Sequence, residues 1–234
     1  MKLRVALAQI NPTVGDLAGN AALISKYAKE AHAASADVVV FPEMVLTGYP
    51  VEDLAMRASF RSASKNALAQ LVSTLEPSIV SVVGYLDESS TGAPQNRVAI
   101  VHGSKVVATY TKRHLPNYGV FDEFRNFVPG DSSLVIRVKG VDIGIAICED
   151  IWHSLADLAA RTPGLVLVPN GSPYERNKDD VRLALVQKRA KEVGAPLAYV
   201  NMTGGQDDLV FDGDSIVVGK DGSVLARTAQ FDDQ

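Results

Sequence analysis

The sequence has 234 residues, of which 47% are hydrophobic and 21% are charged, a composition typical of a globular protein with a sizeable buried core. Its 23 basic and 27 acidic side chains give a formal charge of −4 without a basic stripe, which argues against nucleic acid as a partner. The amino terminus lacks the apolar run of a signal peptide, no segment approaches the roughly 20 apolar residues of a membrane span, and one cysteine cannot form an internal disulfide, so the sequence predicts a protein of the reducing cytoplasm.

Short β-branched runs alternate with alanine-rich amphipathic stretches along the chain. The predicted strands are residues 4–10, 37–42, 78–86, 96–102, 105–110, 133–138, 141–148, 164–169, 196–201 and 214–219. The predicted helices are residues 17–34, 60–75, 153–160 and 180–193.

The strand patterns predict mixed sheets covered by helices. The strings VVVF and LVLV are apolar at every position, which is typical of strands covered on both faces. The turns HGSK and VKGVD predict antiparallel hairpins. With no internal repeat and no credible linker, the sequence predicts one α/β domain. The polar end, ARTAQFDDQ, offers no clear closing element, so we expect a piece of a longer protein.

Cys148 lies in the string GIAICEDIW, between a predicted strand and a predicted helix. Such a turn presents a side chain at the edge of a sheet, and its backbone N–H groups can stabilise an oxyanion. A catalytic thiol also needs a neighbouring base and usually a cation, because it is mostly protonated at neutral pH. Most unpaired cysteines are inert buried residues, so the thiol alone does not identify a site.

Glu43 and Lys112 add a carboxylate and an ammonium at the ends of two other predicted strands. Glu43 follows VVVFP, and Lys112 follows KVVATYT. A carboxylate so close to a buried strand is unfavourable unless it is paired or used. Taken separately, Glu43 is consistent with a helix cap or a surface loop acid, and Lys112 with a solvated surface charge. Together with Cys148, they place three reactive groups at the carboxyl ends of strands, where sites of α/β proteins collect.

These residues resemble the Glu–Lys–Cys triad of the nitrilase (carbon–nitrogen hydrolase) superfamily, in FPEM, YTKRHLPNYGVFDE and ICEDIW. The strings LPNYGVFDE, ICEDIW, NGSPYE and GGQDDLVFDGDS resemble more specifically the glutamine-hydrolysing domain of glutamine-dependent NAD synthetases, over nearly the whole chain. The resemblance implies a four-layer αββα sandwich with mixed sheets, formed as one domain by residues 1–234.

The implied reaction is hydrolysis of the side-chain amide of L-glutamine to glutamate and ammonia through a thioester on Cys148. Glu43 would accept the thiol proton, pass it to the leaving ammonia and activate the attacking water. Lys112, with the backbone N–H after Cys148, would hold the oxyanion. One group acting as base and then as acid suits an amide, whose nitrogen leaves poorly unless it is protonated. The resemblance implies no metal and no cofactor in this domain.

A second acid is a candidate for supporting Lys112. The resemblance suggests Glu123, in VFDE, as a residue that orients the ammonium and keeps it charged. A plain loop acid is the alternative interpretation, and Asp122 is a weaker competitor for the same role.

The resemblance also implies a glutamine pocket, with Glu149 as the partner of the α-ammonium group. The residues implied to line it are Tyr118, Phe121, Glu149, Ser172 and Tyr174. Arg176 is a candidate for the α-carboxylate, although a solvated loop arginine is the simpler interpretation. The four histidines, His114 and His153 among them, receive no role. We expect Asp150 and Trp152 to build the turn at Cys148 rather than to take part in the chemistry.

Full enzymes of this family carry an ATP-dependent synthetase domain with an SGGxDS loop, and that string does not occur here. We therefore expect ATP, Mg²⁺ and deamido-NAD to bind outside this chain, ammonia to pass to a synthetase domain or subunit, and the chain to lack its own carboxyl-terminal end. A homo-oligomer is also expected. The alternatives are a stand-alone amidase of the ω-amidase or carbamoylase type, and a truncated module without catalytic activity.

Overall fold

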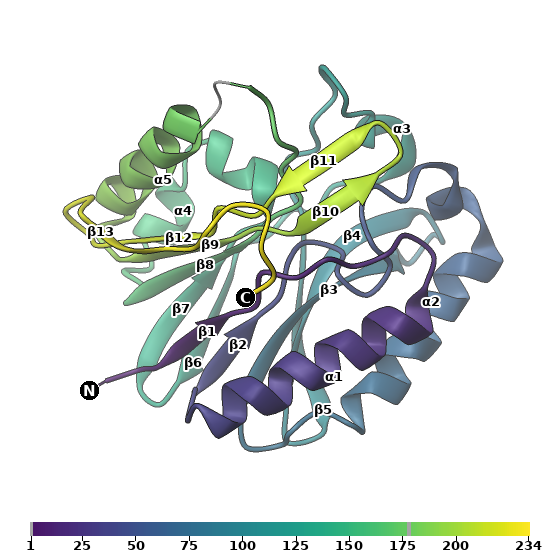
Figure 1. The fold of residues 1–234 in the computed structure, drawn as a ribbon, viewed down its shortest axis with the longest axis horizontal. Coiled ribbons are helices and arrows are strands. Elements are labelled where there is room, and N and C mark those ends of the chain that lie inside the picture. The colour runs from purple at the N-terminus through teal and green to yellow at the C-terminus, as the bar shows by residue number, and fades with distance from the viewer. Residues whose placement is uncertain (1, 177–178) are drawn as a thin grey trace.

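Two mixed β-sheets lie face to face between two layers of helices (Figure 1). The computed structural model describes residues 2–176 and 179–234. The first sheet contains β1 (Val5–Leu7), β2 (Val38–Val40), β3 (Val80–Glu88), β4 (Pro94–His102) and β5 (Lys105–Thr111), in that order. The strands β1, β2 and β3 are parallel, and β4 and β5 continue the sheet antiparallel.

The second sheet has the order β13-β12-β9-β8-β7-β6. Its strands are β6 (Leu134–Val138), β7 (Val141–Ile145), β8 (Leu165–Pro169), β9 (Leu197–Val200), β12 (Ile216–Val218) and β13 (Val224–Arg227). The central strands β7, β8 and β9 are parallel, with antiparallel neighbours on both sides. A separate hairpin pairs β10 (Thr203–Gln206) with β11 (Leu209–Asp212).

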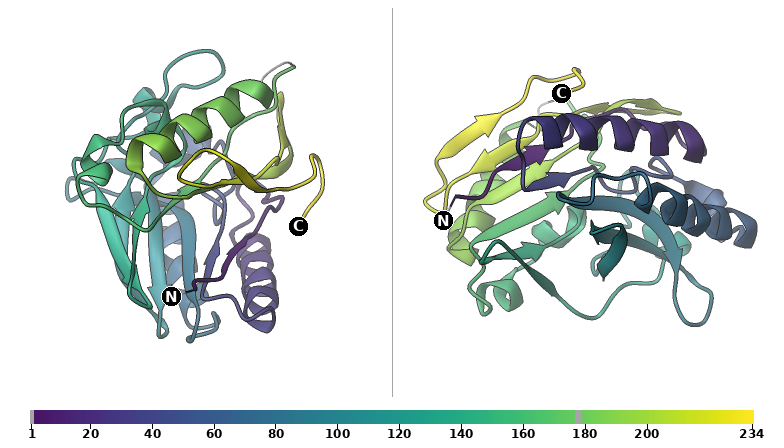
Figure 2. Two further views of the ribbon diagram at one scale, coloured as in Figure 1. Left: turned by 90° about the vertical axis from the view of Figure 1, so that its left-hand side faces the viewer. Right: turned by 90° about the horizontal axis from the view of Figure 1, so that it is seen from below.

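The helices cover the outer faces of the two sheets (Figures 1 and 2). On the first sheet lie α1 (Leu17–Ala33) and α2 (Ala58–Val72); on the second lie α4 (Ala156–Ala159) and α5 (Asp179–Val193). Short helical turns are η1 (Glu52–Met56), α3 (Glu123–Asn126) and η2 (Cys148–Trp152). The first helix begins after Asp16, whose carboxylate accepts the N–H of Gly19 at 2.8 Å. Its buried face includes Ile24 and Ala28, one helical turn apart.

The side chains of strand β2 belong to two different hydrophobic cores. Val38 and Val40 face the second sheet in the central core, whereas Val39 faces the helices α1 and α2. Successive side chains of a strand point to opposite faces, so an all-valine strand suits burial on both sides. The four-layer αββα sandwich predicted from the sequence is confirmed, as are the hairpins β4–β5 and β6–β7.

The structure differs from the prediction in several places, and three of them bear on the site or on the sheet edges. The hairpin β10–β11 and the strand β13 were not predicted, because GGQDD and SVLAR lack the apolar alternation of a half-buried strand. The predicted strand 141–148 ends already at Ile145, and helical geometry begins at Cys148 rather than at His153. The cause is a side-chain cap, since the carboxylate of Asp150 accepts the N–H of Ile147 at 2.9 Å.

The carboxyl-terminal residues return to the first strand region. The backbones of Gln9 and Gln234 exchange two hydrogen bonds of 2.8 Å, and the buried side chain of Gln9 donates to the carbonyls of Ala229 and Asp232. The tail is therefore ordered by a polar residue, although its own sequence carries no strand pattern.

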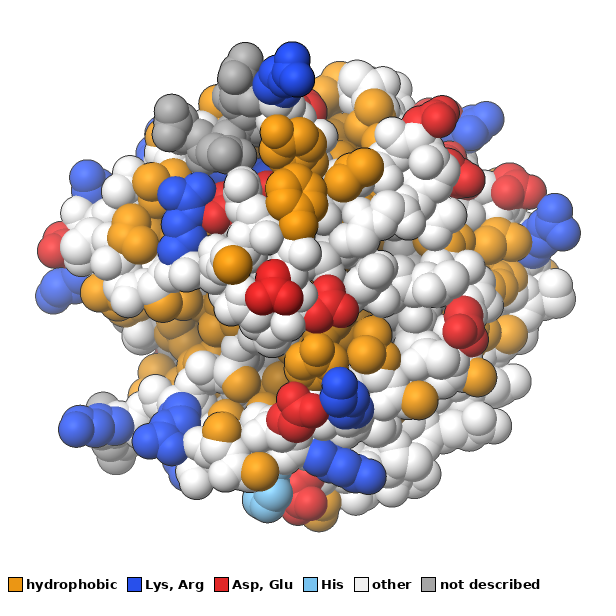
Figure 3. All heavy atoms as spheres, viewed as in Figure 1, with side chains coloured by type: hydrophobic (Ala, Val, Ile, Leu, Met, Phe, Trp, Pro, Cys, Tyr) orange, Lys and Arg blue, Asp and Glu red, His pale blue; other side chains and the backbone are white. Residues whose placement is uncertain are grey.

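Among the described helices, none is both long and apolar enough to cross a bilayer. Lys, Arg, Asp and Glu side chains are interspersed on the face shown in Figure 3.

Candidate active site

Glu43 is fully buried in the loop that follows β2. Its Oε1 accepts hydrogen bonds from Lys112 Nζ and from the side-chain amide of Asn96, both at 2.7 Å, and its Oε2 accepts the N–H of Gly171 at 2.9 Å. The loop passes so close to β3 that a Cβ at Gly84 would lie 2.3 Å from the backbone nitrogen of Met44. These contacts, from three different elements, fix the carboxylate in one orientation.

Lys112 directly follows β5, and its side chain is fully buried as well. Its backbone N–H donates to the carbonyl of Asn96 at 2.9 Å, and its own carbonyl accepts the N–H of Gly130 at 2.8 Å. The ammonium lies between two acids, at 2.7 Å from Glu43 Oε1 and 2.8 Å from Glu123 Oε2. A fully buried ammonium requires such partners.

Glu123 begins the short helix α3 and is 3% exposed. In addition to Lys112 it accepts a hydrogen bond of 2.8 Å from the hydroxyl of Tyr49. Asp122, the competing acid, points away and pairs with Arg125 at 2.8 Å near the surface. Of the two neighbouring acids, the structure brings only Glu123 to the ammonium. We call Glu43, Lys112 and Glu123 the buried charge array.

Cys148 opens the 3-10 turn η2 with a left-handed backbone, at φ +43°. For a residue with a Cβ this conformation costs about 1–3 kcal/mol, so the surroundings must hold it in place. Asp150 supplies those contacts: one carboxylate oxygen accepts from Ile147 N and from the hydroxyl of Tyr110, and the other accepts the N–H of His114 at 2.9 Å. Asp150 thus joins the turn to the segment that carries Lys112.

The charges of the site favour a protonated thiol. Burial raises the pKa of Cys148 well above its usual value, and the carboxylate of Glu43 raises it further against the attraction of Lys112. Burial would lower the pKa of Lys112, but the carboxylates of Glu123 and Glu43 raise it well above its usual range. Burial also raises the pKa of Glu123 despite the nearby ammonium. One cation faces two acids, so the thiol loses its proton only if another group nearby takes it.

A groove of ≈ 630 Å³ opens beside the cysteine turn. Of the residues implied to bind substrate, Tyr118 and Glu149 line it, and the Tyr118 hydroxyl donates to Glu149 Oε2 at 2.8 Å. Burial raises the pKa of Glu149, and the hydrogen bond from Tyr118 opposes that rise. Arg176 and His153 also line the groove.

The other three residues implied to bind substrate lie outside the walls of this groove. Phe121 packs edge-on against Tyr118, with ring centroids 5.6 Å apart. Ser172 is buried, and its N–H donates to Asn201 at 2.9 Å. Tyr174 packs against Phe231, with ring centroids 5.4 Å apart. Their roles in binding remain predictions, with Phe121 placed to support Tyr118 rather than to line the groove itself.

Several residues of the site were not found from the sequence. Asn96 and Tyr49 contact the buried charge array from β4 and from the loop after Glu43, and neither stands in a pattern that separates it from an ordinary strand or loop residue. Only Gly171 of these three carries a sequence signal that points to the site, because it lies in NGSPYE, just after a buried strand. A Cβ there would lie 2.8 Å from the ring of Tyr49, so only glycine lets the backbone N–H at this position reach Glu43 while Tyr49 reaches Glu123.

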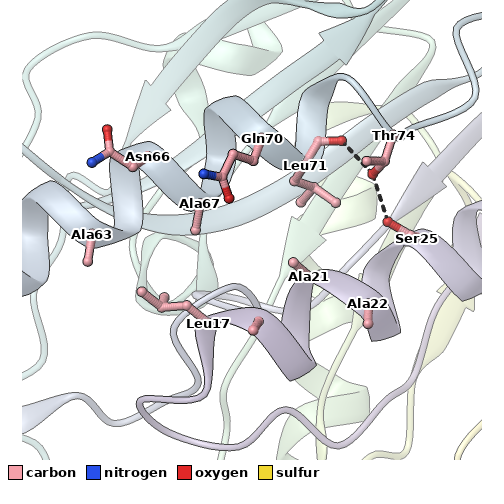
Figure 4. A pocket seen from close by; sticks show the side chains of 11 residues that line it. Leu17, Ala21, Ala22, Ser25, Ala63, Asn66, Ala67, Gln70, Leu71 and Thr74 are labelled. Atoms are coloured by element: carbon pink, nitrogen blue, oxygen red, sulfur yellow. Dashed lines mark hydrogen bonds between the residues drawn. The ribbon is translucent and has the colours of Figure 1, made fainter.

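A larger groove, of ≈ 740 Å³, lies between α1 and α2 on the outside of the first sheet (Figure 4). Its walls are small side chains such as Ala21, Ala22 and Ala67, and a 3.0 Å hydrogen bond joins Ser25 to Thr74 at its end. None of the candidate site residues lines it.

Among the described residues, no group of three or more His, Cys, Asp or Glu side chains could hold a metal ion.

Comparison with known proteins places the chain in a family. The family model described as carbon–nitrogen hydrolase matches residues 4–234. The glutamine-dependent NAD(+) synthetase of Xylella fastidiosa is 47% identical over 240 residues, which cover 99% of this chain and 43% of that protein. The structure of the glutamine-dependent NAD+ synthetase of Acinetobacter baumannii superposes with a TM-score of 0.95 at 37% identity, covering 99% of this chain and 44% of that one.

A different neighbour is an amidase of the nitrilase superfamily from Nesterenkonia, with a TM-score of 0.86 at 27% identity; the match covers 99% of this chain and 88% of that one. In another structure of that amidase, an acetamide group from fluoroacetamide is attached to its active-site cysteine. The chain spans less than half the length of the synthetases that it matches, but most of the length of the amidase.

Proposed function

The chain belongs to the carbon–nitrogen hydrolase family, and from this premise we propose that it hydrolyses the side-chain amide of L-glutamine and supplies ammonia to an ATP-dependent NAD synthetase domain or subunit. The single observation that supports it most is the buried charge array beside a cysteine with a left-handed backbone. A fold holds such an arrangement only at a cost in stability, and such costs are typical of functional sites.

Cys148 is the nucleophile in this proposal, and Glu43 is the base that receives its proton. The transfer moves a proton between two buried acids, so the net charge of the buried region stays constant and no ion has to enter from water. The sulfur then attacks the amide carbon, and Lys112, with the backbone N–H of Glu149, stabilises the negative charge on the former carbonyl oxygen. Fixed donors in a dry site stabilise such charge more strongly than water does.

Collapse of the tetrahedral species requires a proton on the leaving nitrogen, and Glu43 returns the one it accepted. Ammonia leaves, and a thioester between Cys148 and the glutamate chain remains. Glu43 then deprotonates a water that attacks the thioester carbon, and the thiolate leaves and regains a proton from Glu43. Glu123 does not touch the reacting atoms in this scheme. It is a positioning residue that holds the Lys112 ammonium toward the oxyanion.

Glutamine is the preferred substrate class because the synthetases are far more similar in sequence than the amidase, at 47% against 27% identity. Glu149, buried next to the nucleophile in the chain, offers a carboxylate for the α-ammonium of glutamine, and Tyr118 holds that carboxylate in place. In this proposal ATP, Mg²⁺ and deamido-NAD bind outside the 234 residues, and ammonia is the product that the second site consumes.

The test is a comparison of amides together with labelling of the thiol. We expect release of ammonia from glutamine at a higher kcat/KM than from small aliphatic amides or carbamoyl compounds, and stoichiometric alkylation of Cys148 by a glutamine analogue with an electrophilic carbon. Peptide mass spectrometry locates the label. Preference for aliphatic or carbamoyl amides would instead identify a stand-alone amidase, and absence of both turnover and labelling would identify a module without catalytic activity.

A further inference from the structure

Two histidines without a predicted role form a stacked pair next to the two acids that follow Cys148. The rings of His114 and His153 lie 4.0 Å apart and are inclined by only 10°. His114 comes from the segment just after Lys112, and His153 follows the end of η2. The pair therefore connects the two chain segments that carry the proposed oxyanion donor and the nucleophile.

Each ring faces a different carboxylate. His114 Nδ1 is 3.1 Å from Asp150 Oδ1, a hydrogen bond that joins the segment after Lys112 to the turn η2. His153 Nε2 is 3.7 Å from Glu149 Oε1, an ion-pair distance that matters only when the imidazole is protonated. Tyr118 holds the other oxygen, Oε2, of the same carboxylate. Glu149 and His153 both line the groove, and Oε1 of Glu149 has His153 at ion-pair distance, with His114 as a further electrostatic neighbour of the carboxylate.

We propose that His153 is a positioning residue that controls, through Glu149, the affinity of the site for the α-ammonium group of its substrate. This inference rests on the proposed function. A neutral His153 leaves the carboxylate to the substrate ammonium. A protonated His153 is a second cation at the same oxygen, so it competes with the ammonium and weakens binding. The chemistry of the amide carbon is not involved, and the effect belongs to KM rather than to kcat.

The surroundings of His153 keep it neutral near pH 7. Burial lowers its pKa, the neighbouring His114 and the guanidinium of Arg189 lower it further, and Asp150 opposes them. Arg189, from α5, is held close by because it donates to the carbonyl of Trp152 at 2.9 Å. The charged or titratable groups that face the same groove or turn are Glu149, Asp150, His114, Tyr118, Glu175, Arg176 and Arg189. Protonation of His153 therefore needs a more acidic solution than protonation of a free imidazole does.

The experiment measures kcat and KM between pH 5 and pH 8 for glutamine and for glutaramate, an ω-amide that lacks the α-ammonium group. His153→Gln keeps a neutral hydrogen-bond donor but cannot be protonated, whereas His153→Lys is a permanent cation. His102→Gln, at the exposed β4–β5 turn, is the matched control and should behave as the parent.

We expect the KM of the parent for glutamine to rise on acidification by about fivefold more than that of His153→Gln, the ratio expected for an ion pair in which the histidine is half exposed. His153→Lys should raise the KM for glutamine about fivefold already at pH 7.5. With glutaramate, the KM of each variant should follow that of the parent at every pH, because this substrate has no ammonium group to compete with His153 for Glu149.

Two failures are distinguishable. An enzyme that hydrolyses glutamine with the same acid-side KM profile in parent and His153→Gln overturns this inference alone, as does a loss of kcat at every pH with both substrates, which marks a structural role. An enzyme that hydrolyses simple amides but not glutamine overturns the proposed function, and this inference with it.

Discussion

Two of the buried ion clusters among the described residues differ in charge balance. Arg182, from α5, is 1% exposed and pairs with the fully buried Asp212 at 2.8 Å, one cation with one anion. Its Nη2 also donates to the carbonyl of Pro173 at 2.9 Å and to that of Ser172 at 3.5 Å. The buried charge array, by contrast, places two acids around one ammonium beside a thiol.

The contrast teaches that a buried ion pair does not by itself identify a reactive site. Arg182 and Asp212 neutralise each other and tie the NGSPYE loop to α5 and β11, which is an architectural role. In the buried charge array an excess acid raises the proton affinity of its neighbours, so protons can move within the cluster. Removing Arg182 from the first cluster should mainly change stability, whereas removing Lys112 or Cys148 from the second should mainly change the chemistry.

Cys148→Ala should have the largest effect. Without a nucleophile no thioester forms, so kcat for glutamine should fall by about 10⁴-fold or more. The change is small in volume and relieves no charge, so thermal unfolding should remain close to that of the parent. The measurement is ammonia release, with circular dichroism melts as the control. Residual turnover within tenfold of the parent would contradict the assignment of the nucleophile.

Lys112→Met is expected to lower kcat by about 10²- to 10³-fold, the usual effect of losing one oxyanion donor. It also leaves Glu43 and Glu123 facing each other without a cation, so the variant should unfold more easily at neutral pH than at pH 5, where acids accept protons. Steady-state kinetics and denaturant melts at both pH values give the two readouts. An unchanged kcat would remove Lys112 from the oxyanion site.

Arg182→Met should mainly destabilise the fold, by about 3–5 kcal/mol, because it leaves Asp212 buried without its partner. The matched variant Arg182→Met with Asp212→Leu removes both charges and should recover most of that loss. Urea melts measure both. The contrast between the two clusters would break down if the double variant were no more stable than the single one.

Glu123→Gln should have the smallest effect, visible in the pH dependence of stability. Burial raises the folded-state pKa of Glu123 above its unfolded value, so its contribution to stability is complete below the unfolded pKa and is lost as pH rises through the folded pKa. Glutamine does not titrate. The free energy of unfolding of the variant should therefore fall less than that of the parent between about pH 5 and pH 8, measured by urea melts. A steeper fall in the variant contradicts the direction of the shift.

Much of the fold was predictable because local pattern and tertiary environment agree. The valines of β2 are apolar at successive positions, and the structure buries each of them in one of two cores. The hairpins at Gly103 and Gly140 follow from turn chemistry, which acts over a few residues. The β10–β11 hairpin was missed because its glycines and acids carry no such pattern, and its strands are specified by pairing with each other.

The sequence by itself determined mixed sheets covered by helices, because strand alternation and helix periodicity are local properties. Its short motifs carried the resemblance that implied the four layers and the three proposed catalytic side chains. Only the tertiary structure decided which acids reach Lys112, that Asp122 turns away while Glu123 does not, and that two unassigned histidines stack beside Glu149. Those facts depend on contacts between residues far apart in the chain, whose geometry is set by how the sheets and loops pack together and not by neighbouring letters in the sequence.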